Sequence, residues 1–313
     1  MRYAKVSSSG GIVMNDELST ILDGQPERIA TGFVFTEGPL WHPDSFLYFV
    51  DIRRSHLLRW VPGRQVEVLR ENTNEGNGLT FDLQGRLLMC EGGNRRVTRT
   101  EKDGTVTVLA DGWDGKRLNR PNDVVGRSDG SIYFTDPQGR VPQEEREIGF
   151  SGVFRVGPDG QVNLATDECE YPNGLAFSPD EAILYVAISR LDERCLGEEE
   201  SNEVCTHRRI RAFDVAPDGS LSNNRIFADM SSAETGVPDG MKVDMEGRVF
   251  CTGNGGTCVF DKDGRQLGTI RTDEVPANCA FGGSDLRTLF LTARTSLYSV
   301  RVKSPGVAVP RAA

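Results

Sequence analysis

Apolar and polar residues alternate in short paired segments along residues 37–294, and Asp, Gly and Ser residues separate the two members of each pair. In PNDVVGRSDGSIYFTDP (121–137), one apolar segment leads into a Ser-Asp-Gly turn, and a second apolar segment ends at Asp136. Alternation with a period of two is typical of β-strands, and these turn residues are typical of hairpin connections. The pattern therefore predicts a β-hairpin in residues 121–137.

The hairpin pattern occurs six times. The copies are EGPLWHPDSFLYFVDI (37–52), NGLTFDLQGRLLMCEG (77–92), PNDVVGRSDGSIYFTDP (121–137), PNGLAFSPDEAILYVAIS (172–189), PDGMKVDMEGRVFCTGN (238–254) and PANCAFGGSDLRTLFLTAR (276–294). Further hairpin patterns between the copies supply the outer strands of each repeat. About four strands in a repeat of roughly 40 to 65 residues is the signature of a β-propeller blade. The sequence therefore predicts an all-β fold, a six-bladed β-propeller with four-stranded blades around a central channel.

A ring of blades has no unpaired edge only when its two ends meet. The ERIATGFVF segment (27–35) has a strand pattern, and we expect it to complete the last blade beside the strands at about 288–303. A short helical turn is expected around residues 16–22. The chain then divides into an N-terminal arm (1–24), a six-bladed propeller (25–304) and a C-terminal tail (305–313).

Composition restricts the partners of the chain. The 313 residues carry a net charge of −10, and no Lys/Arg cluster is interleaved with aromatic residues, so nucleic acid is not an expected partner. No apolar run approaches the ~20 residues that span a bilayer, so no membrane association is expected. Residues 1–24 lack the continuous apolar region of a signal peptide, which predicts a cytoplasmic protein. The seven cysteines have no CxxC spacing, although Cys195 and Cys205 flank an acidic loop and could form a disulfide.

Three connections are longer than blade geometry requires, namely residues 111–119, 138–150 and 189–209. Long loops on a rigid scaffold often carry recognition residues. The acidic loop 189–209 could act as a lid over a binding site, or it could be a solvent-exposed loop without a binding role.

In a propeller blade, the residue just before the innermost strand points toward the channel axis. Five of the six copies place an oxygen-donor side chain there, and the set is Glu37, Asn77, Asn122, Asn173 and Asp239, with Ala277 in the sixth copy. An all-oxygen set with two carboxylates suits one hard divalent cation, above all Ca²⁺, with Mg²⁺, Mn²⁺ or Zn²⁺ as alternatives. These residue types are also common in turns, so a purely local role at each position is the alternative.

The second strands of the first three copies return to the same mouth of the channel and end in acids, Asp51, Glu91 and Asp136. Asp51 and Asp136 could form a second cation site, or these acids could accept hydrogen bonds from neighbouring turns. The residues alone leave both roles open.

Several longer motifs point to one family. They are TEGPLWHP (36–43), YFVDI (48–52), NRRVTR (94–99), RLNRPNDVV (117–125), DGSIYFTDP (129–137), YPNGLAFSPD (171–180) and VPDGMKVD (237–244). In these motifs the chain resembles the senescence-marker-protein/gluconolactonase/luciferin-regenerating-enzyme family of six-bladed propellers. The resemblance implies a substrate contact from Arg120. It also implies one divalent metal, bound by Glu37, Asn122, Asn173 and Asp239.

The implied activity is the hydrolysis of a sugar lactone or a similar aldonolactone. A bound cation would polarise the carbonyl, and Asp239 is the predicted base that takes a proton from the attacking water. Asn77, Arg120 and Glu91 are the predicted substrate contacts. A water assisted by Glu91 or Asp136 is the alternative to Asp239. A small-molecule lactone is therefore the expected partner, and the oligomeric state is not fixed by the sequence.

Two other functions are open, a phosphotriesterase- or fluorophosphatase-like hydrolase and a non-catalytic calcium-binding propeller. Related propellers place the same Glu, Asn, Asn and Asp set around Ca²⁺. Serine- or histidine-dependent hydrolysis is not supported, because the chain has only three His and no GxSxG motif. Gly92 in CEGGNRR (90–96) stands in place of the His of many similar lactonases, so their substrate specificity does not transfer directly.

Overall fold

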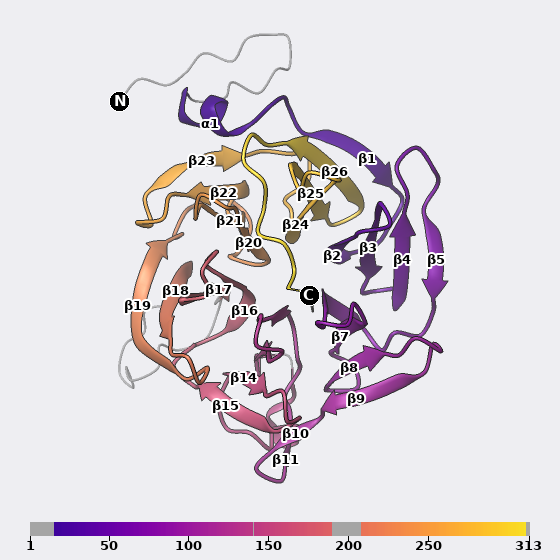
Figure 1. The fold of residues 1–313 in the computed structure, drawn as a ribbon, viewed down its shortest axis with the longest axis vertical. Helices are drawn as coiled ribbons and strands as arrows, with labels where there is room; N and C mark the ends of the chain where they lie inside the picture. The colour runs from indigo at the N-terminus through magenta and orange to yellow at the C-terminus, as the bar shows by residue number, and fades with distance from the viewer. Residues whose placement is uncertain (1–15, 140, 190–207, 311–313) are drawn as a thin grey trace.

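The computed structural model describes residues 16–139, 141–189 and 208–310, and six four-stranded antiparallel sheets follow one another around a ring (Figure 1). In five sheets the strands are hydrogen-bonded in chain order, from the innermost strand outward. The sixth sheet takes its outermost strand from the N-terminal part of the chain. This architecture confirms the predicted six-bladed β-propeller.

Each of the first three blades opens with a predicted hairpin. Blade 1 contains β2 (Thr36–His42), β3 (Phe46–Asp51), β4 (His56–Trp60) and β5 (Glu67–Arg70). Blade 2 contains β6 (Gly76–Phe81), β7 (Leu87–Glu91), β8 (Arg96–Thr100) and β9 (Val106–Ala110). Blade 3 contains β12 (Val124–Gly126), β13 (Ile132–Asp136), β14 (Gly152–Val156) and β15 (Val162–Thr166).

The other three blades repeat this order. Blade 4 contains β16 (Pro172–Phe177), β17 (Ile183–Ser189), β18 (Arg208–Val215) and β19 (Leu221–Asp229). Blade 5 contains β20 (Met241–Val243), β21 (Val249–Gly253), β22 (Gly256–Phe260) and β23 (Gln266–Ile270). Blade 6 contains β24 (Asn278–Gly282), β25 (Thr288–Ala293), β26 (Ser296–Arg301) and β1 (Glu27–Thr31).

The N-terminal strand closes the ring, as predicted. β1 runs antiparallel to β26, and Thr31 lies opposite Ser296. β1 ends at Thr31 rather than at residue 35, because the chain turns through Gly32 with a φ of 103° before it crosses to blade 1. A φ in this range favours glycine, so the strand pattern of residues 27–35 is interrupted at that point.

The short helix α1 (Asp16–Ile21) lies outside the ring, next to β23 (Figure 1). Leu18 and Ile21 are buried in an apolar cluster that blades 5 and 6 share. The Ile21 carbonyl also accepts a hydrogen bond from the Lys303 N–H at 2.8 Å. Residues 16–22 of the predicted arm are therefore packed on the propeller.

Two of the long connections contain small elements. β10 (Gly112–Trp113) and β11 (Lys116–Arg117) form a hairpin within 111–119, and η1 (Gln143–Glu145) lies within 138–150. The connection 189–209, with the predicted Cys195–Cys205 pair, lies almost entirely outside the described residues. The cysteines that the structure describes, five in number, are buried free thiols. No helix in the described ranges combines the length and the apolar character that a bilayer crossing requires.

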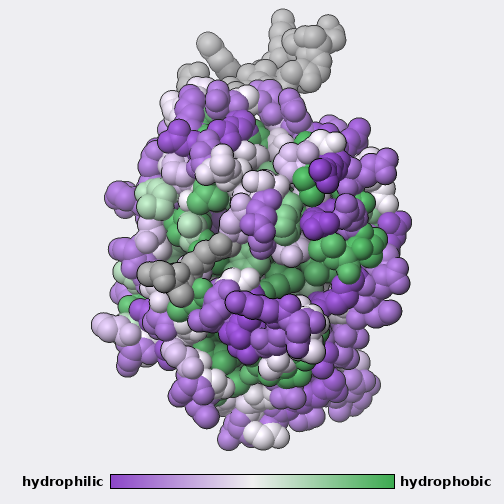
Figure 2. Space-filling view, turned by 45° about the vertical axis from the view of Figure 1, so that its right-hand side comes forward, coloured by the Kyte–Doolittle hydropathy of each residue, from purple (hydrophilic) through white to green (hydrophobic). Residues whose placement is uncertain are grey.

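Apolar side chains pack between neighbouring blades and hold them at a fixed spacing. Tyr133 of blade 3 packs edge-to-face on Phe177 of blade 4, with ring centroids 5.2 Å apart. Trp41 of blade 1 stacks on Phe290 of blade 6 at 5.3 Å. Burial of one such large side chain contributes about 1.5–3 kcal/mol. Hydrophilic residues dominate the surface, and hydrophobic residues gather near the middle of the face in Figure 2.

The inner strands begin at one mouth of the channel and end at the other. We call the mouth at their starts the polar mouth, because it carries Glu37, Asn77, Asn122, Asn173 and Asp239. We call the opposite mouth the tail mouth, because residues 303–310 run from blade 6 to the middle of the ring there (Figure 1). The Val307 N–H donates to the Val243 carbonyl at the end of β20, at 2.9 Å, and so attaches the tail to blade 5.

Candidate active site

The polar residues of three blades lie in irregular stretches of strand. In blades 1, 2 and 4 the register shifts at the start of the inner strand, over residues 37–40, 76–79 and 172–175. A β-bulge bends a strand and changes the direction of its side chains. The three irregular stretches contain three of the predicted site residues, which are Glu37, Asn77 and Asn173.

A glycine follows four of the polar residues and allows neighbouring inner strands to approach closely. A Cβ atom at Gly38, where φ is +53°, would overlap the Asn77 carbonyl oxygen of the next blade. A Cβ atom at Gly174 would overlap the Asp239 carbonyl oxygen in the same way. Only glycine fits such contacts, so these glycines bring neighbouring polar residues to a common rim.

Asn278 closes this rim in blade 6, where the sequence pattern placed Ala277. The Asn278 side-chain amide donates to Glu37 Oε2 at 2.8 Å, and Gly240 lies against the same amide. Ala277 is buried, and its carbonyl accepts the Gly240 N–H at 2.8 Å. The sequence comparison of the copies missed Asn278 because its signal, the Asn of PANC (276–279), lies one position out of phase with the other copies.

Glu37 is a carboxylate that is only 3% exposed. Burial raises the pKa of Glu37 to about 7, and the Asp123 carboxylate acts in the same direction. The Gly38 N–H, which donates to Oε2 at 2.7 Å, lowers this pKa, as do the Asn278 amide and the Lys242 ammonium. A divalent cation beside Glu37 would supply positive charge to a buried anion.

Asp123 is a buried acid that the sequence analysis did not single out. Its Oδ1 accepts the Val124 N–H at 2.9 Å, whereas Oδ2 is buried without a hydrogen-bond partner among the described residues. Burial raises the pKa of Asp123, and Lys242 lowers it. Glu37, Asp123 and Lys242 belong to blades 1, 3 and 5, so these charges influence one another across the ring. In the sequence, an Asp beside Pro-Asn is typical of a turn and gives no sign of this burial.

The Asn173 side-chain amide is held in one orientation. Its Nδ2 donates to Ser189 Oγ at 2.8 Å, and Ser189 Oγ donates in turn to the Pro238 carbonyl, which fixes the amide orientation. The remaining atom, Oδ1, is buried and has no hydrogen-bond partner within the described residues. A buried, oriented acceptor without a donor fits a cation, because carbonyl oxygens are preferred ligands of hard cations.

Asn122 and Asp239 lie in the segments that lead into β12 and β20. The Asn122 N–H donates to the Thr135 carbonyl at 2.9 Å, and the Asp239 N–H donates to the Thr252 carbonyl at 3.0 Å. These equivalent bonds attach each residue to the second strand of its own blade. Both residues are half-buried. The polar mouth thus carries the four predicted ligands at corresponding positions of blades 1, 3, 4 and 5.

The donor set of these four residues consists of two carboxylates and two amides. Within the described ranges, no group of three or more Asp, Glu, His or Cys side chains is placed to hold a metal ion. The predicted ligand set contains only two such side chains, so it depends on the amide oxygens. Such a set selects a hard, oxygen-binding cation.

A small polar depression lies at the same mouth. It is lined by Ile52, Glu75, Asn77, Gly92, Arg120, Pro121, Asn122, Pro137 and Tyr171. Within it the Arg120 guanidinium donates to the Glu75 carboxylate. A Cβ atom at Gly92 would lie 3.2 Å from Cγ and Nε of Arg120, so Gly92 leaves the space that this side chain occupies. Two predicted substrate contacts, Asn77 and Arg120, therefore share one depression with Asn122.

Glu91, the third predicted substrate contact, has other partners. The side chain is buried, and its carboxylate accepts hydrogen bonds from Arg96 Nε at 2.8 Å and from Thr98 Oγ1 at 3.0 Å. Glu91 is not among the residues that line the depression. Its contact with a substrate stays a prediction.

Asp51 and Asp136 accept hydrogen bonds from backbone N–H groups in the segments that lead into their blades. Asp51 accepts the Val34 N–H at 2.9 Å, and Asp136 accepts the N–H groups of Asn119 and Arg120, both at 2.7 Å. Burial raises the pKa of Asp136 to about 7, and the two N–H donors act against this shift. These bonds correspond to the turn-holding role that the sequence left open. A second cation site at Asp51 and Asp136 stays a prediction.

The chain is similar in sequence and fold to known lactonases. Residues 35–295 match the family model described as the SMP-30/Gluconolactonase/LRE-like region. A gluconolactonase from Zymomonas mobilis is 31% identical over 92% of this chain and 85% of the relative. A pentonolactonase from Haloferax volcanii is 31% identical over 82% of this chain and 80% of the relative. The solved structure of a gluconolactonase from Xanthomonas campestris is 34% identical, covers 93% of both chains and superposes with a TM-score of 0.79.

Proposed function

The chain belongs to the SMP-30/gluconolactonase/LRE-like family, and from this premise we propose that it is a metal-dependent lactonase acting on an aldonolactone. Its matched relatives include a gluconolactonase and a pentonolactonase, which supports a sugar lactone as the substrate class. The observation that carries the metal dependence is the Asn173 amide, which Ser189 orients and whose Oδ1 is buried without a partner in the described part of the chain.

Glu37, Asn122, Asn173 and Asp239 would hold one divalent cation. Their oxygen-only chemistry favours Ca²⁺, and Mg²⁺, Mn²⁺ and Zn²⁺ are the alternatives. When bound, the cation supplies Lewis acidity that polarises the lactone carbonyl. The buried Glu37 carboxylate supports this assignment, because a neighbouring cation stabilises its ionised form.

The residues of the chain then move protons and orient the substrate. Asp239 takes a proton from the water whose oxygen bonds to the lactone carbonyl carbon. The ring C–O bond breaks, and Asp239 returns the proton to the ring oxygen, which leaves as the hydroxyl of the product. Asn77 and Arg120 donate N–H groups to substrate oxygens, which orients the ring and stabilises the developing charge. The product is an aldonic acid, which releases one proton at neutral pH.

The depression also suits a substrate rich in hydroxyl groups. The Glu75 carboxylate supplies hydrogen-bond acceptors, and the Arg120 guanidinium beside it supplies donors. The side-chain amides of Asn77 and Asn122 supply both. Polar groups that converge in a small pocket fix the orientation of a ligand by hydrogen bonds. A polyhydroxylated ring is therefore a better match for this mouth than an apolar ester.

Proton release from glucono-1,5-lactone, corrected for spontaneous hydrolysis, tests the proposal. We expect protein treated with a chelator to lose turnover and to regain it when Ca²⁺ is added, with Mg²⁺, Mn²⁺ and Zn²⁺ assayed in parallel. Full turnover in protein shown by elemental analysis to contain no metal would contradict the metal dependence. No turnover with any cation, on glucose- or pentose-derived lactones, would contradict the sugar-lactone assignment and direct the search to phosphotriesters.

A further inference from the structure

A second cavity lies at the tail mouth, at the end of the channel opposite the predicted metal site. It has a volume of about 420 Å³. Cavities that bind small organic ligands have volumes of roughly 300–1,000 Å³. Neither the lactonase assignment nor the polar residues of the other mouth give this cavity a role.

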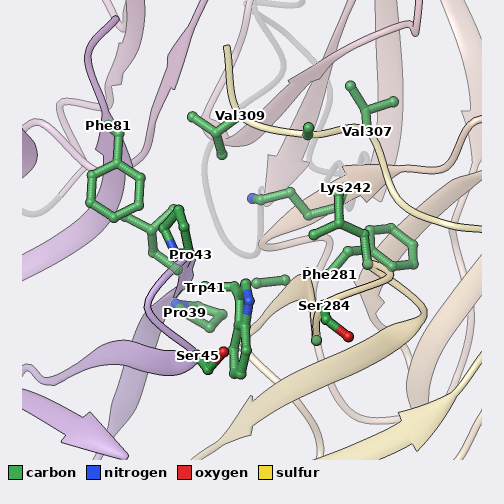
Figure 3. Close-up of a pocket in the computed structure, with 15 residues that line it drawn as sticks. Pro39, Trp41, Pro43, Ser45, Phe81, Lys242, Phe281, Ser284, Val307 and Val309 are labelled. Carbon is green, nitrogen blue, oxygen red and sulfur yellow. The ribbon is translucent and has the colours of Figure 1, made fainter. Parts of the chain in front are cut away.

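The walls of the cavity are mainly apolar and come from distant parts of the chain. Trp41 of blade 1, Phe81 of blade 2 and Phe281 of blade 6 supply aromatic surfaces, and Val307 and Val309 of the tail supply aliphatic ones. Figure 3 shows these side chains arranged around a common space. Aromatic and aliphatic walls of this kind suit a hydrocarbon chain or ring, because binding removes apolar surface from water.

The tail wall of the cavity is anchored to the blades by backbone hydrogen bonds. The Val307 N–H donates to the Val243 carbonyl, and the Met245 N–H donates to the Pro305 carbonyl, both at 2.9 Å. Gly306 lies against the ring of Phe281 so closely that a Cβ atom there would overlap it. The cavity is therefore formed in advance of any ligand, which lowers the entropy cost of binding.

Lys242 is the one charged side chain among the residues that line the cavity. Its side chain extends into the space between Phe81 and Phe281 (Figure 3). Nζ donates to the Met241 carbonyl at 2.9 Å. An ammonium carries three N–H donors. Lys242 therefore supplies positive charge and hydrogen-bond donors to a mainly apolar cavity. A carboxylate is the complementary ligand group.

We propose that the tail-mouth cavity binds an amphipathic monocarboxylate, a small molecule with one carboxylate and an apolar body. The carboxylate accepts hydrogen bonds from Lys242 Nζ, and the apolar body packs against Trp41, Phe81 and Val309. The site is separate from the lactone site and does not depend on lactone hydrolysis.

Lys242 also faces Glu37 and Asp123, which lie further along the channel. These carboxylates compete with a bound anion for the ammonium. A neutral ligand with the same hydrocarbon chain separates the charge contribution from the apolar one. Octanoate and 1-octanol form such a pair.

Isothermal titration calorimetry of the full chain with octanoate and with 1-octanol tests the site. We expect wild-type protein to bind octanoate more tightly than 1-octanol. Lys242→Met should weaken octanoate binding about tenfold or more, since charge-assisted hydrogen bonds contribute about 1.5–3 kcal/mol, and should leave 1-octanol binding within about twofold. Ala280→Leu, which fills the cavity from β24, should weaken both ligands about tenfold, while glucono-1,5-lactone turnover stays at the wild-type rate.

Three results would overturn the proposal. They are no octanoate binding at millimolar concentration, unchanged octanoate binding by Ala280→Leu, and equal losses of octanoate and 1-octanol binding in Lys242→Met. If Ala280→Leu does not fold, Val309→Trp fills the same cavity from the tail, and unchanged octanoate binding by that variant would also overturn the proposal. Lactone turnover in the same samples reports on the other mouth, so the two assignments fail separately.

Discussion

At the scale of single residues, the polar mouth combines side chains that are held in place with atoms that lack partners. Asn173 is fixed through Ser189, and its Oδ1 is buried without a partner in the described part of the chain. Glu37 is fixed through Asn278 and Gly38. Such pre-organisation is expected at a site that binds a ligand, because polar groups buried without a partner are costly in a purely structural role.

The proposed base gives the sharpest prediction at this scale. Asp239→Asn keeps an oxygen donor for the cation but cannot take a proton from water, so kcat should fall by about a hundredfold or more. The thermal unfolding midpoint should change little, since the side chain is only half-buried. Steady-state kinetics and calorimetry of the variant measure both quantities. A turnover close to that of wild type would reassign the base.

The Glu75–Arg120 pair gives a second residue-scale prediction. Glu75→Gln removes the charge that holds the Arg120 guanidinium in the depression. We expect KM for the lactone to rise about three- to tenfold with kcat little changed, since a partly exposed ion pair contributes about 1 kcal/mol. Glu67→Gln, which removes an ion pair with Arg59 on the outer strands of blade 1, is the matched control. Equal effects of the two variants would contradict a role of Glu75 in positioning Arg120.

Sequence reasoning predicted that a set of polar residues shares one mouth of the channel, and it missed other residues that only the fold brings to the same place. Glu37, Asn122, Asn173 and Asp239 could be predicted, because each begins a repeat whose geometry is known. Asn278 and Asp123 could not, since one lies out of phase with the repeat and the other follows a predicted ligand in what resembles a turn. Their roles depend on contacts across the channel, which a sequence comparison of repeats does not contain.

At the scale of the elements, the starts of the inner strands determine how closely the blades meet. Strand periodicity predicted the hairpins, because alternating burial leaves a signal in every strand. The irregular stretches at residues 37–40 and 172–175 leave no such signal. The sequence nevertheless contains a glycine after four of the five polar residues, and the structure identifies these glycines as points of closest approach between blades.

Gly174→Ala tests this role of the glycines. The new Cβ would overlap the Asp239 carbonyl oxygen, so the two inner strands must move apart. We expect the free energy of unfolding to fall by about 1–3 kcal/mol, with a loss of lactone turnover larger than the loss of stability explains. Gly149→Ala, at an exposed position with no heavy atom within 4 Å of the new Cβ, should change stability by less than about 1 kcal/mol. Chemical denaturation of both variants gives the comparison, and equal stabilities would contradict the close-approach account.

At the scale of the whole molecule, the ring depends on a strand from the other end of the chain. The N-terminal strand could be predicted because a propeller without it leaves an unpaired edge. Its end at Thr31 could not, because the turn at Gly32 depends on where blade 1 begins. The packing of α1 on blades 5 and 6 and the crossing of the tail to the channel were also not predicted, since neither segment repeats.

Removal of β1 tests the closure of the ring. A chain that begins at residue 33 lacks the strand that pairs with β26. We expect its thermal unfolding midpoint to fall by about 10 °C or more, or the protein to self-associate through the free edge of β26. Differential scanning calorimetry and light scattering distinguish these outcomes from an unchanged, monodisperse protein. An unchanged thermal unfolding midpoint in a monodisperse protein would show that the ring closes without β1.

The central claim is that one cation at the polar mouth makes this propeller a lactonase. The most direct test is to titrate chelated protein with Ca²⁺ and to measure bound cation and lactone turnover in the same samples. We predict that turnover rises with occupancy of a single site and reaches its maximum at one equivalent of bound cation. Asn173→Ala should bind the cation at least about tenfold more weakly, with turnover reduced in the same proportion at limiting cation. Turnover that does not follow occupancy, or that is complete in the metal-free protein, would contradict the claim.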